Sequence, residues 1–221
     1  MKSIGVRGEM AAVIATLMIG LAACSSGVES GTPRDVALGE WRPLQRSAAL
    51  TDRGEVGLVP VGETPAPTVS ALADYYRERL GVNVRVLDNF RLPPEATDLK
   101  RGQIVAETVI TLLRSRFPRT KYLIGVVDTD MYSREAGYRF AFSNRDWGDD
   151  WGVAIVSTAR MDPTNFRQPR DPELLMARLK KMVTKNLSLV YYQLETSTDP
   201  ESVLFSPVMS LDDLDRMGQG F

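Results

Sequence analysis

Two acidic residues, Asp128 and Asp130, follow directly on a continuous apolar run at residues 122–127. Such a run predicts a buried strand, so both carboxylates are expected at the carboxyl end of that strand. Carboxylates in this position can bind calcium, but a calcium site needs six or more oxygen ligands, and the neighbouring sequence supplies no recognisable set. The pattern therefore favours turn formation and capping, which are common roles of aspartate.

Serine nucleophiles are a second possibility for chemistry. Ser157 ends an apolar run, and Ser188 lies three residues after Lys185, so the latter two would share one face of a helix. A serine attacks a substrate only when a base removes its proton, and the chain contains no histidine. No further motif accompanies the pair of Ser188 and Lys185, so the sequence favours structural roles for these side chains.

Two tryptophans, Trp147 and Trp151, flank a short acidic stretch that we expect in a loop between strands. Tryptophan is enriched at binding hot spots, so the two rings could form an exposed recognition patch. They could equally cover the edge of a sheet and stabilise the loop. The sequence leaves both interpretations open.

The composition indicates one ordinary domain with a core, because 43% of the 221 residues are hydrophobic and 25% are charged. Lys and Arg number 27 and Asp and Glu number 28, which gives a formal net charge of −1. A nucleic-acid-binding surface needs an excess of positive charge, so we expect no nucleic-acid partner.

The apolar periodicity alternates between strand and helix patterns, which predicts an α/β fold with a mixed, twisted sheet of about four to five strands. The expected strands are residues 56–61, 82–87, 122–127, 138–142 and 152–157. Two helices precede residue 122: residues 69–80, closed by Gly81, and residues 102–117, stopped by Pro118.

A long helix is expected to begin at Asp171-Pro172, where an N-cap acid precedes a proline at the first helical position. Its apolar residues recur at three- and four-residue steps and form one buried stripe, made of Leu175, Leu179, Met182 or Val183, Leu187, Val190 and Leu194. A capping box at residues 210–213 predicts a short C-terminal helix that runs through Met217.

The N-terminal segment resembles a bacterial lipoprotein signal. Two basic residues precede an apolar stretch from Met10 to Leu21, which is too short for a settled transmembrane helix. The sequence Leu-Ala-Ala-Cys24 then resembles a lipobox, in which the cysteine is lipidated after cleavage, and Cys24 is the sole cysteine.

We therefore expect residues 1–23 to be a signal peptide that is removed, residues 24–54 to be a lipid-anchored flexible tether and residues 55–221 to be the folded domain. Acyl chains such as palmitate on Cys24 would anchor the protein to a membrane. The expected location is the bacterial cell envelope, facing the periplasm or the exterior.

Several segments, in their order along the chain, resemble the archaemetzincins, which are metzincin-type zinc metallopeptidases. The similar segments are residues 92–93, 96, 101–103, 106–107, 122–130, 138–142 and 153–160, followed by the long helix. The resemblance implies a metzincin-like domain from about Val56 to the C-terminus, in which the long helix is the former active-site helix.

The motif of this family is His-Glu-x-x-His-x-x-Gly-x-x-His, in which two imidazoles one helical turn apart hold zinc and the glutamate acts as the base. Aligned on the basic residues Arg178 and Lys181, the five motif positions fall on Thr184, Lys185, Ser188, Tyr191 and Leu194. None of them matches, and a chain without histidine cannot supply the motif in any register. The resemblance therefore implies a degenerate active site.

The resemblance also implies a second zinc site, formed in the family by cysteines near the C-terminus. Here Ser202 takes a cysteine position and Leu204 the position of the methionine turn. Because Cys24 is the sole cysteine, we expect neither zinc ion nor any other cofactor.

In metzincins the strand equivalent to residues 138–142 lies at the sheet edge and pairs with an extended peptide substrate, an ability that needs no metal. The resemblance assigns this role to Tyr138, Arg139, Phe140, Ala141 and Phe142. The sequence thus predicts a catalytically inactive lipoprotein that binds a peptide or an envelope protein in the former cleft. Two alternatives stay open: a peptidase with a non-standard site, and a structural lipoprotein without a specific ligand.

Overall fold

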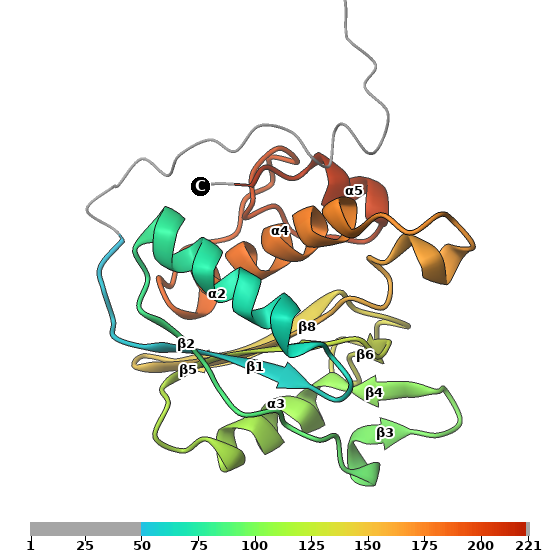
Figure 1. The fold of residues 1–221 in the computed structure, drawn as a ribbon, viewed down its shortest axis with the longest axis horizontal. Coiled ribbons are helices and arrows are strands. Elements are labelled where there is room, and N and C mark those ends of the chain that lie inside the picture. Colours follow the sequence, from blue (N-terminus) through green and yellow to red (C-terminus); the bar gives the residue numbers. More distant parts are fainter. Residues whose placement is uncertain (1–49, 220–221) are drawn as a thin grey trace, which may run out of the picture. The chain divides into compact units, whose positions relative to one another are not determined.

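A computed structural model describes residues 50–219 and shows a five-stranded sheet with the order β2-β1-β5-β8-β7 (Figure 1). The first four strands are parallel, and β7 runs antiparallel to β8 at one edge. The strands are β1 (Val56–Val61), β2 (Val84–Val86), β5 (Tyr122–Val127), β7 (Ser143–Gly148) and β8 (Trp151–Ser157). The predicted mixed sheet is confirmed.

Helices cover both faces of this sheet. Figure 1 shows α2 and α4 on one face and α3 on the other. The helices are α2 (Ala66–Leu80), α3 (Ala106–Arg116), α4 (Pro172–Val190) and α5 (Leu211–Arg216), with single 3-10 turns η1 (Pro94–Ala96) and η2 (Pro163–Phe166). A small second sheet joins β3 (Thr97–Asp98), β4 (Gln103–Val105) and β6 (Met131–Tyr132).

Strand β5 shows how the sheet forms two cores. Tyr122, Ile124 and Val126 belong to the hydrophobic cluster under α2 and α4, whereas Leu123 and Val127 belong to the cluster under α3. Alternate side chains of a strand point to opposite faces, so a continuous apolar run is what a strand covered on both faces requires.

Local signals placed the starts of α4 and α5 and the end of α2 correctly. The Asp171 carboxylate accepts the Leu174 N–H at 3.0 Å, and the Ser210 hydroxyl accepts the Asp213 N–H at 3.1 Å. Gly81 closes α2 in the left-handed region with φ of 63°. These caps depend only on neighbouring residues, which is why the sequence alone predicts them.

Two predicted elements are wrong. Residues 138–142 form a loop, because the Ala141 N–H donates to Met131 of β6 and the Arg139 carbonyl accepts side-chain donors, so the edge strand starts only at Ser143. Residues 103–105 form β4 and not the first turn of a helix. There the Ile104 N–H donates to the Asp130 carbonyl, and such long-range bonds leave no local signal.

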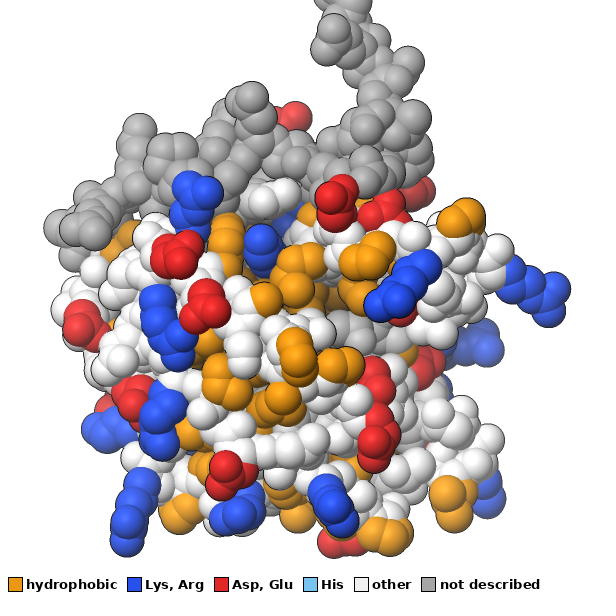
Figure 2. Space-filling view, viewed as in Figure 1, with side chains coloured by type: hydrophobic (Ala, Val, Ile, Leu, Met, Phe, Trp, Pro, Cys, Tyr) orange, Lys and Arg blue, Asp and Glu red, His pale blue; other side chains and the backbone are white. Residues whose placement is uncertain are grey.

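Helix α4 is buried on all sides from Lys181 to Val190. It ends at Val190, so Leu194, which the predicted stripe included, lies beyond the helix. On the face drawn in Figure 2, apolar side chains gather in the middle of the surface and charged side chains surround them. A helix hydrophobic or buried all round must satisfy its polar side chains inside the protein.

A buried ion pair joins α4 to α5. Arg178 donates to both carboxylate oxygens of Asp215, at 2.7 and 2.6 Å, and to the Met161 carbonyl at 2.9 Å. Lys181 donates to the Asp215 carbonyl at 2.6 Å. Breaking a buried pair of this kind costs about 3–5 kcal/mol, so it fixes the position of the C-terminal helix.

Within residues 50–219, no helix is long and apolar enough to cross a membrane. The predicted signal peptide, Cys24 and most of the predicted tether lie outside the described residues. The last part of the tether, from Leu50 to Gly54, contacts the domain: Leu50 packs on the core, and the Arg53 N–H donates to the Tyr191 hydroxyl at 2.8 Å.

We predict that Gly152→Ala destabilises the domain by about 1–3 kcal/mol, because a Cβ at this position would lie 2.6 Å from Val190 Cβ and 2.7 Å from the Val190 carbonyl oxygen. Strand β8 and α4 would have to separate locally. Urea unfolding measures the loss. Glu78→Ala, on the exposed side of α2, is the control and should change stability by less than about 0.5 kcal/mol. Equal stability of the two variants would contradict the close packing of β8 on α4.

The two buried lysines of α4 predict that stability rises between pH 7.5 and 9.5. Burial lowers the pKa of Lys181 to about 8; the charge of Asp215 opposes this shift and that of Arg178 adds to it. Burial, together with the positive charge of Arg145, lowers the pKa of Lys185 to about 8. Above pH 8 the folded lysines are neutral while unfolded ones stay charged to about pH 10.5, so the unfolded state binds more protons. We expect the free energy of unfolding to rise by about 1–2 kcal/mol per lysine.

The double variant Lys181→Met, Lys185→Met should lose this rise, whereas Lys100→Met, which replaces an exposed lysine, should keep it. The comparison stays below pH 10, because burial raises the pKa of Tyr76 and Tyr191 and these tyrosines lower stability only at higher pH. An unchanged rise in the double variant would show that the buried lysines are not its source.

Candidate functional site

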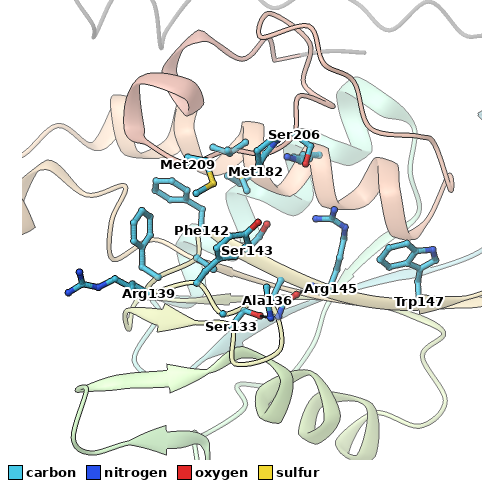
Figure 3. A pocket seen from close by; sticks show the side chains of 18 residues that line it. Ser133, Ala136, Arg139, Phe142, Ser143, Arg145, Trp147, Met182, Ser206 and Met209 are labelled. Atoms are coloured by element: carbon cyan, nitrogen blue, oxygen red, sulfur yellow. Dashed lines mark hydrogen bonds between the residues drawn. The ribbon is translucent and has the colours of Figure 1, made fainter.

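A pocket of about 610 Å³ lies between the start of β7 and α4 (Figure 3). One wall is the loop 136–142 with β7, and the opposite wall is α4 with residues 206–209. The loop precedes the edge strand, and β7 has no strand neighbour beyond it in the described sheet. The pocket therefore opens beside a free sheet edge.

Aromatic rings form the loop side of the pocket. Phe140 and Phe142 stack edge to face with ring centroids 5.6 Å apart, and Tyr138 is 45% exposed. The three rings thus line a common pocket, although residues 138–142 do not form the predicted strand.

Asp130 holds this loop in place. Arg160 donates to both of its carboxylate oxygens, at 2.9 and 2.8 Å, and the Arg160 guanidinium lies 4.2 Å from the centroid of the Phe140 ring. Gln103 donates to Asp130 at 2.9 Å and to the Arg139 carbonyl at 3.1 Å. Asp130 is thus engaged in structural bonds, whereas Asp128 is exposed and accepts from the Thr129 hydroxyl at 3.4 Å.

Two cations face the pocket from opposite walls. Figure 3 shows Arg145 reaching from β7 toward α4. Lys185 belongs to α4 and lines the pocket from the other wall. Lys185 is 3% exposed and donates to the Phe205 carbonyl. The Arg145 Nε atom is buried and has no hydrogen-bond partner in the described part of the chain. Burial lowers the pKa of both groups, and the positive charge of Arg145 lowers that of Lys185 further.

A smaller pocket of about 490 Å³ adjoins the first one and shares Arg145 and Trp147 with it. Its other wall is the end of α4 and the residues after it, including Leu189 and Glu195. Together the two pockets form one cleft that follows β7, which we call the β7 cleft.

The five predicted motif positions do not come together. Thr184 bonds the Tyr76 hydroxyl at 3.0 Å, and Ser188 donates back to the Thr184 carbonyl at 2.7 Å, so neither lines the β7 cleft. The Tyr191 hydroxyl donates to the Asp52 carboxylate at 2.7 Å, away from the cleft. Only Lys185 and Leu194 line it, in different pockets.

The cleft face of α4 lies one residue on from the predicted motif positions Thr184 and Ser188. The residues with the spacing of two zinc-binding histidines that face the cleft are Lys185 and Leu189. A helical period of 3.6 residues places Thr184 and Ser188 toward α2, and no residue pattern indicates which face of α4 would be open. In either register, the side chains present are no ligands for zinc.

The donor set of the cleft does not fit a zinc ion. No group of three or more His, Cys, Asp or Glu residues within residues 50–219 could hold a metal. At the predicted second zinc site, the Ser202 hydroxyl accepts the Leu204 N–H at 3.1 Å and so stabilises a turn. We therefore derive no chemical step through a metal.

The serine candidates are also engaged elsewhere. Ser157 donates to the Thr129 carbonyl at 2.8 Å. Ser188 is fully buried, and its hydroxyl donates to a carbonyl of the helix backbone. Lys185 bonds a carbonyl and not Ser188. The described geometry contains no pair in which a base could activate either serine.

The two tryptophans lie on opposite faces of the sheet. Trp147 is 49% exposed and lines the β7 cleft, whereas Trp151 packs on the α3 core with Arg114 stacked 3.5 Å above its ring. The two residues belong to neighbouring strands, β7 and β8, which are joined by a two-residue turn. Because their rings lie on opposite faces of the sheet, the prediction of a single recognition patch is wrong. Trp151 thus covers the sheet, whereas a recognition role for the exposed Trp147 stays a prediction.

Sequence reasoning missed Arg145 and the segment 206–209. Alternation along β7 could have indicated that Arg145 and Trp147 share a face, but the strand was assigned to the preceding residues. The C-terminal segment carries no local signal for its place against α4.

No family model matches the chain. The archaemetzincin of Pyrococcus abyssi is 31% identical over 160 residues, which are 68% of this chain and 81% of that protein. The archaemetzincin of Pyrococcus furiosus is 27% identical over 160 residues, covering 69% and 80% of the two chains.

Solved structures agree. The archaemetzincin of Methanopyrus kandleri superposes with a TM-score of 0.61 at 28% identity, covering 76% of this chain and 88% of that one. The archaemetzincin of Archaeoglobus fulgidus, complexed with malonate, has a TM-score of 0.63 at 21% identity, covers 76% and 95% of the two chains and shows the shared fold. By sequence and by fold, this chain belongs to the archaemetzincin family.

Proposed function

We propose that the domain is a non-catalytic archaemetzincin that binds an extended peptide or protein segment in the β7 cleft. The observation that carries this proposal is the cleft itself: a pocket of about 610 Å³ beside a free sheet edge, lined by aromatic rings, with Lys185 and Leu189 where two metal ligands would face it. Clefts of this size with few polar groups are typical binding sites.

The edge of β7 supports an extended ligand. The Arg145 N–H bonds the side-chain oxygen of Asn144 at 2.8 Å, so this backbone group is not part of the ladder with β8. An added strand can displace such a local bond and pair with the edge, while its alternate side chains enter pockets. Trp147, 49% exposed beside this edge, offers the kind of surface found at binding hot spots.

The proposal includes a place in the cell. Lipidation of Cys24 would anchor the domain to a membrane of the bacterial envelope, and the bound segment would then belong to an envelope protein or peptide. A peptidase with a non-standard site is the alternative from another class. No described side chain favours it, because both serine hydroxyls and Lys185 are engaged with carbonyl groups.

The first test uses a phage library that displays random decapeptides. Phage that bind the purified chain are selected from it. We expect enriched peptides that bind with a Kd in the micromolar range and that lose at least about tenfold in affinity on Trp147→Ala, because hot-spot tryptophans contribute about 2 kcal/mol or more. Fluorescence anisotropy of the synthetic peptides measures the affinities.

Phe166→Ala provides a matched control, because Phe166 is 46% exposed but lies on η2 and lines neither pocket of the cleft. Its affinity for the selected peptides should equal that of the parent. Failure to enrich any peptide, or equal losses in the two variants, would favour the structural lipoprotein without a specific ligand.

A second test concerns catalysis. Because the cleft lacks zinc ligands, we expect the purified chain to hold less than about one-tenth of an equivalent of zinc after dialysis against a micromolar zinc buffer, and to leave casein and the selected peptides intact. Metal analysis and mass spectrometry of the peptides measure these outcomes. Stoichiometric zinc, or cleavage abolished by a chelator or by Ser188→Ala, would establish the enzyme alternative.

A further inference from the structure

The larger pocket of the β7 cleft carries positive charge without a counter-charge. Among the 18 residues that line it, Arg139, Arg145 and Lys185 are cationic, and none is acidic. No ion pair found within residues 50–219 involves any of these three. Glu195 lines the adjoining pocket, but it is exposed and forms no ion pair among the described residues either.

Arg145 is the more telling cation, because part of its guanidinium is out of water. Its Nε atom is buried and lacks an acceptor, although a guanidinium presents five donors. The centroid of the Trp147 ring lies 5.7 Å from Arg145 Cζ. A buried donor without a partner destabilises the free protein, so an acceptor that reaches this atom gains binding free energy.

Lys185 adds a second charge from the opposite wall. Its ammonium group donates to the Phe205 carbonyl, which is neutral, and retains two more N–H donors. Burial lowers the pKa of Lys185, and repulsion by the positive charge of Arg145 lowers it further. An anion between them would relieve this repulsion and raise the pKa again.

The remaining walls restrict the kind of anion. Tyr138, Phe140, Phe142 and Met182 line the pocket, and Val208 and Met209 close it from the C-terminal segment. The ligand must therefore join a negative group to an apolar one. A carboxylate matches the fork of an arginine with two parallel hydrogen bonds, and it is the anion that an unmodified peptide carries.

We propose that the β7 cleft recognises a peptide carboxylate, held between Arg145 and Lys185, with an apolar side chain of the same ligand against the aromatic loop. This inference rests on the proposed function and names the ligand class of that site. The carboxylate comes either from the C-terminus of the ligand or from an acidic side chain, and the two sources share the same recognition chemistry.

Three small probes separate the possibilities: N-acetyl-leucine, which has a terminal carboxylate; N-acetyl-glutamic acid α-amide, which has a side-chain carboxylate; and N-acetyl-leucinamide, which has none. Nitrogen-15 NMR follows the indole N–H of Trp147, assigned with Trp147→Phe, during titration at constant ionic strength. We expect at least one carboxylate probe to bind at least about tenfold more tightly than the uncharged amide. The probe that binds more tightly identifies whether the carboxylate comes from the C-terminus or from a side chain.

Arg145→Met and Lys185→Met should each weaken the carboxylate probe at least about tenfold and leave the amide unchanged, whereas Arg116→Met, at the exposed end of α3, should change neither. The same spectra show whether each variant is folded. If Lys185→Met does not fold, Arg145→Met decides alone.

Equal binding of all three probes overturns the carboxylate inference and leaves peptide binding intact. The carboxylate inference, but not peptide binding, is also overturned if no probe binds and the display-selected peptides keep their affinity when every carboxylate is converted to an amide. Absence of both probe binding and display-selected peptides overturns the inference and the proposed function together.

Discussion

The structure depends on a helix that has no exposed side from Lys181 to Val190, although this stretch contains several polar side chains. Each must find a partner inside the protein, because an unpaired buried polar group costs about 1–3 kcal/mol. Thr184 meets a tyrosine of α2, Ser188 and Asn186 donate to the helix backbone, and Lys181 donates to a carbonyl of α5. The hydrogen bonds of these α4 side chains thereby fix the positions of α2 and α5.

Hydrogen bonds connect α4 to the segment that follows it: Lys185 bonds the Phe205 carbonyl, and Arg178 bonds Asp215. The long charged side chains of α4 therefore have both a structural and an electrostatic role. They hold the C-terminal segment against the helix, and Lys185 also gives the cleft a positive charge.

The sequence predicts the parts of this fold that local chemistry decides. The run at residues 122–127 suffices for β5, and Asp171-Pro172 suffices for the start of α4. The loop at residues 138–142 mimics a strand, because rings that line one pocket can alternate as regularly as rings on one face of a strand. The facing of Arg145 and Lys185 could not be predicted, since it depends on how β7 and α4 pack. The same packing decides which face of α4 meets the cleft.

The contact of Tyr191 with the chain before β1 has a mechanical consequence. The Tyr191 hydroxyl bonds the Asp52 carboxylate, the Arg53 N–H and the Gly54 carbonyl, immediately after the end of α4. A pulling force applied to the chain at Leu50 would load these bonds before it reached β1. Because β1 lies inside the parallel sheet between β2 and β5, its ladders would resist in shear while the bonds to Tyr191 break one at a time. Tyr191 thus makes the first link to yield, next to the helix that forms one wall of the cleft.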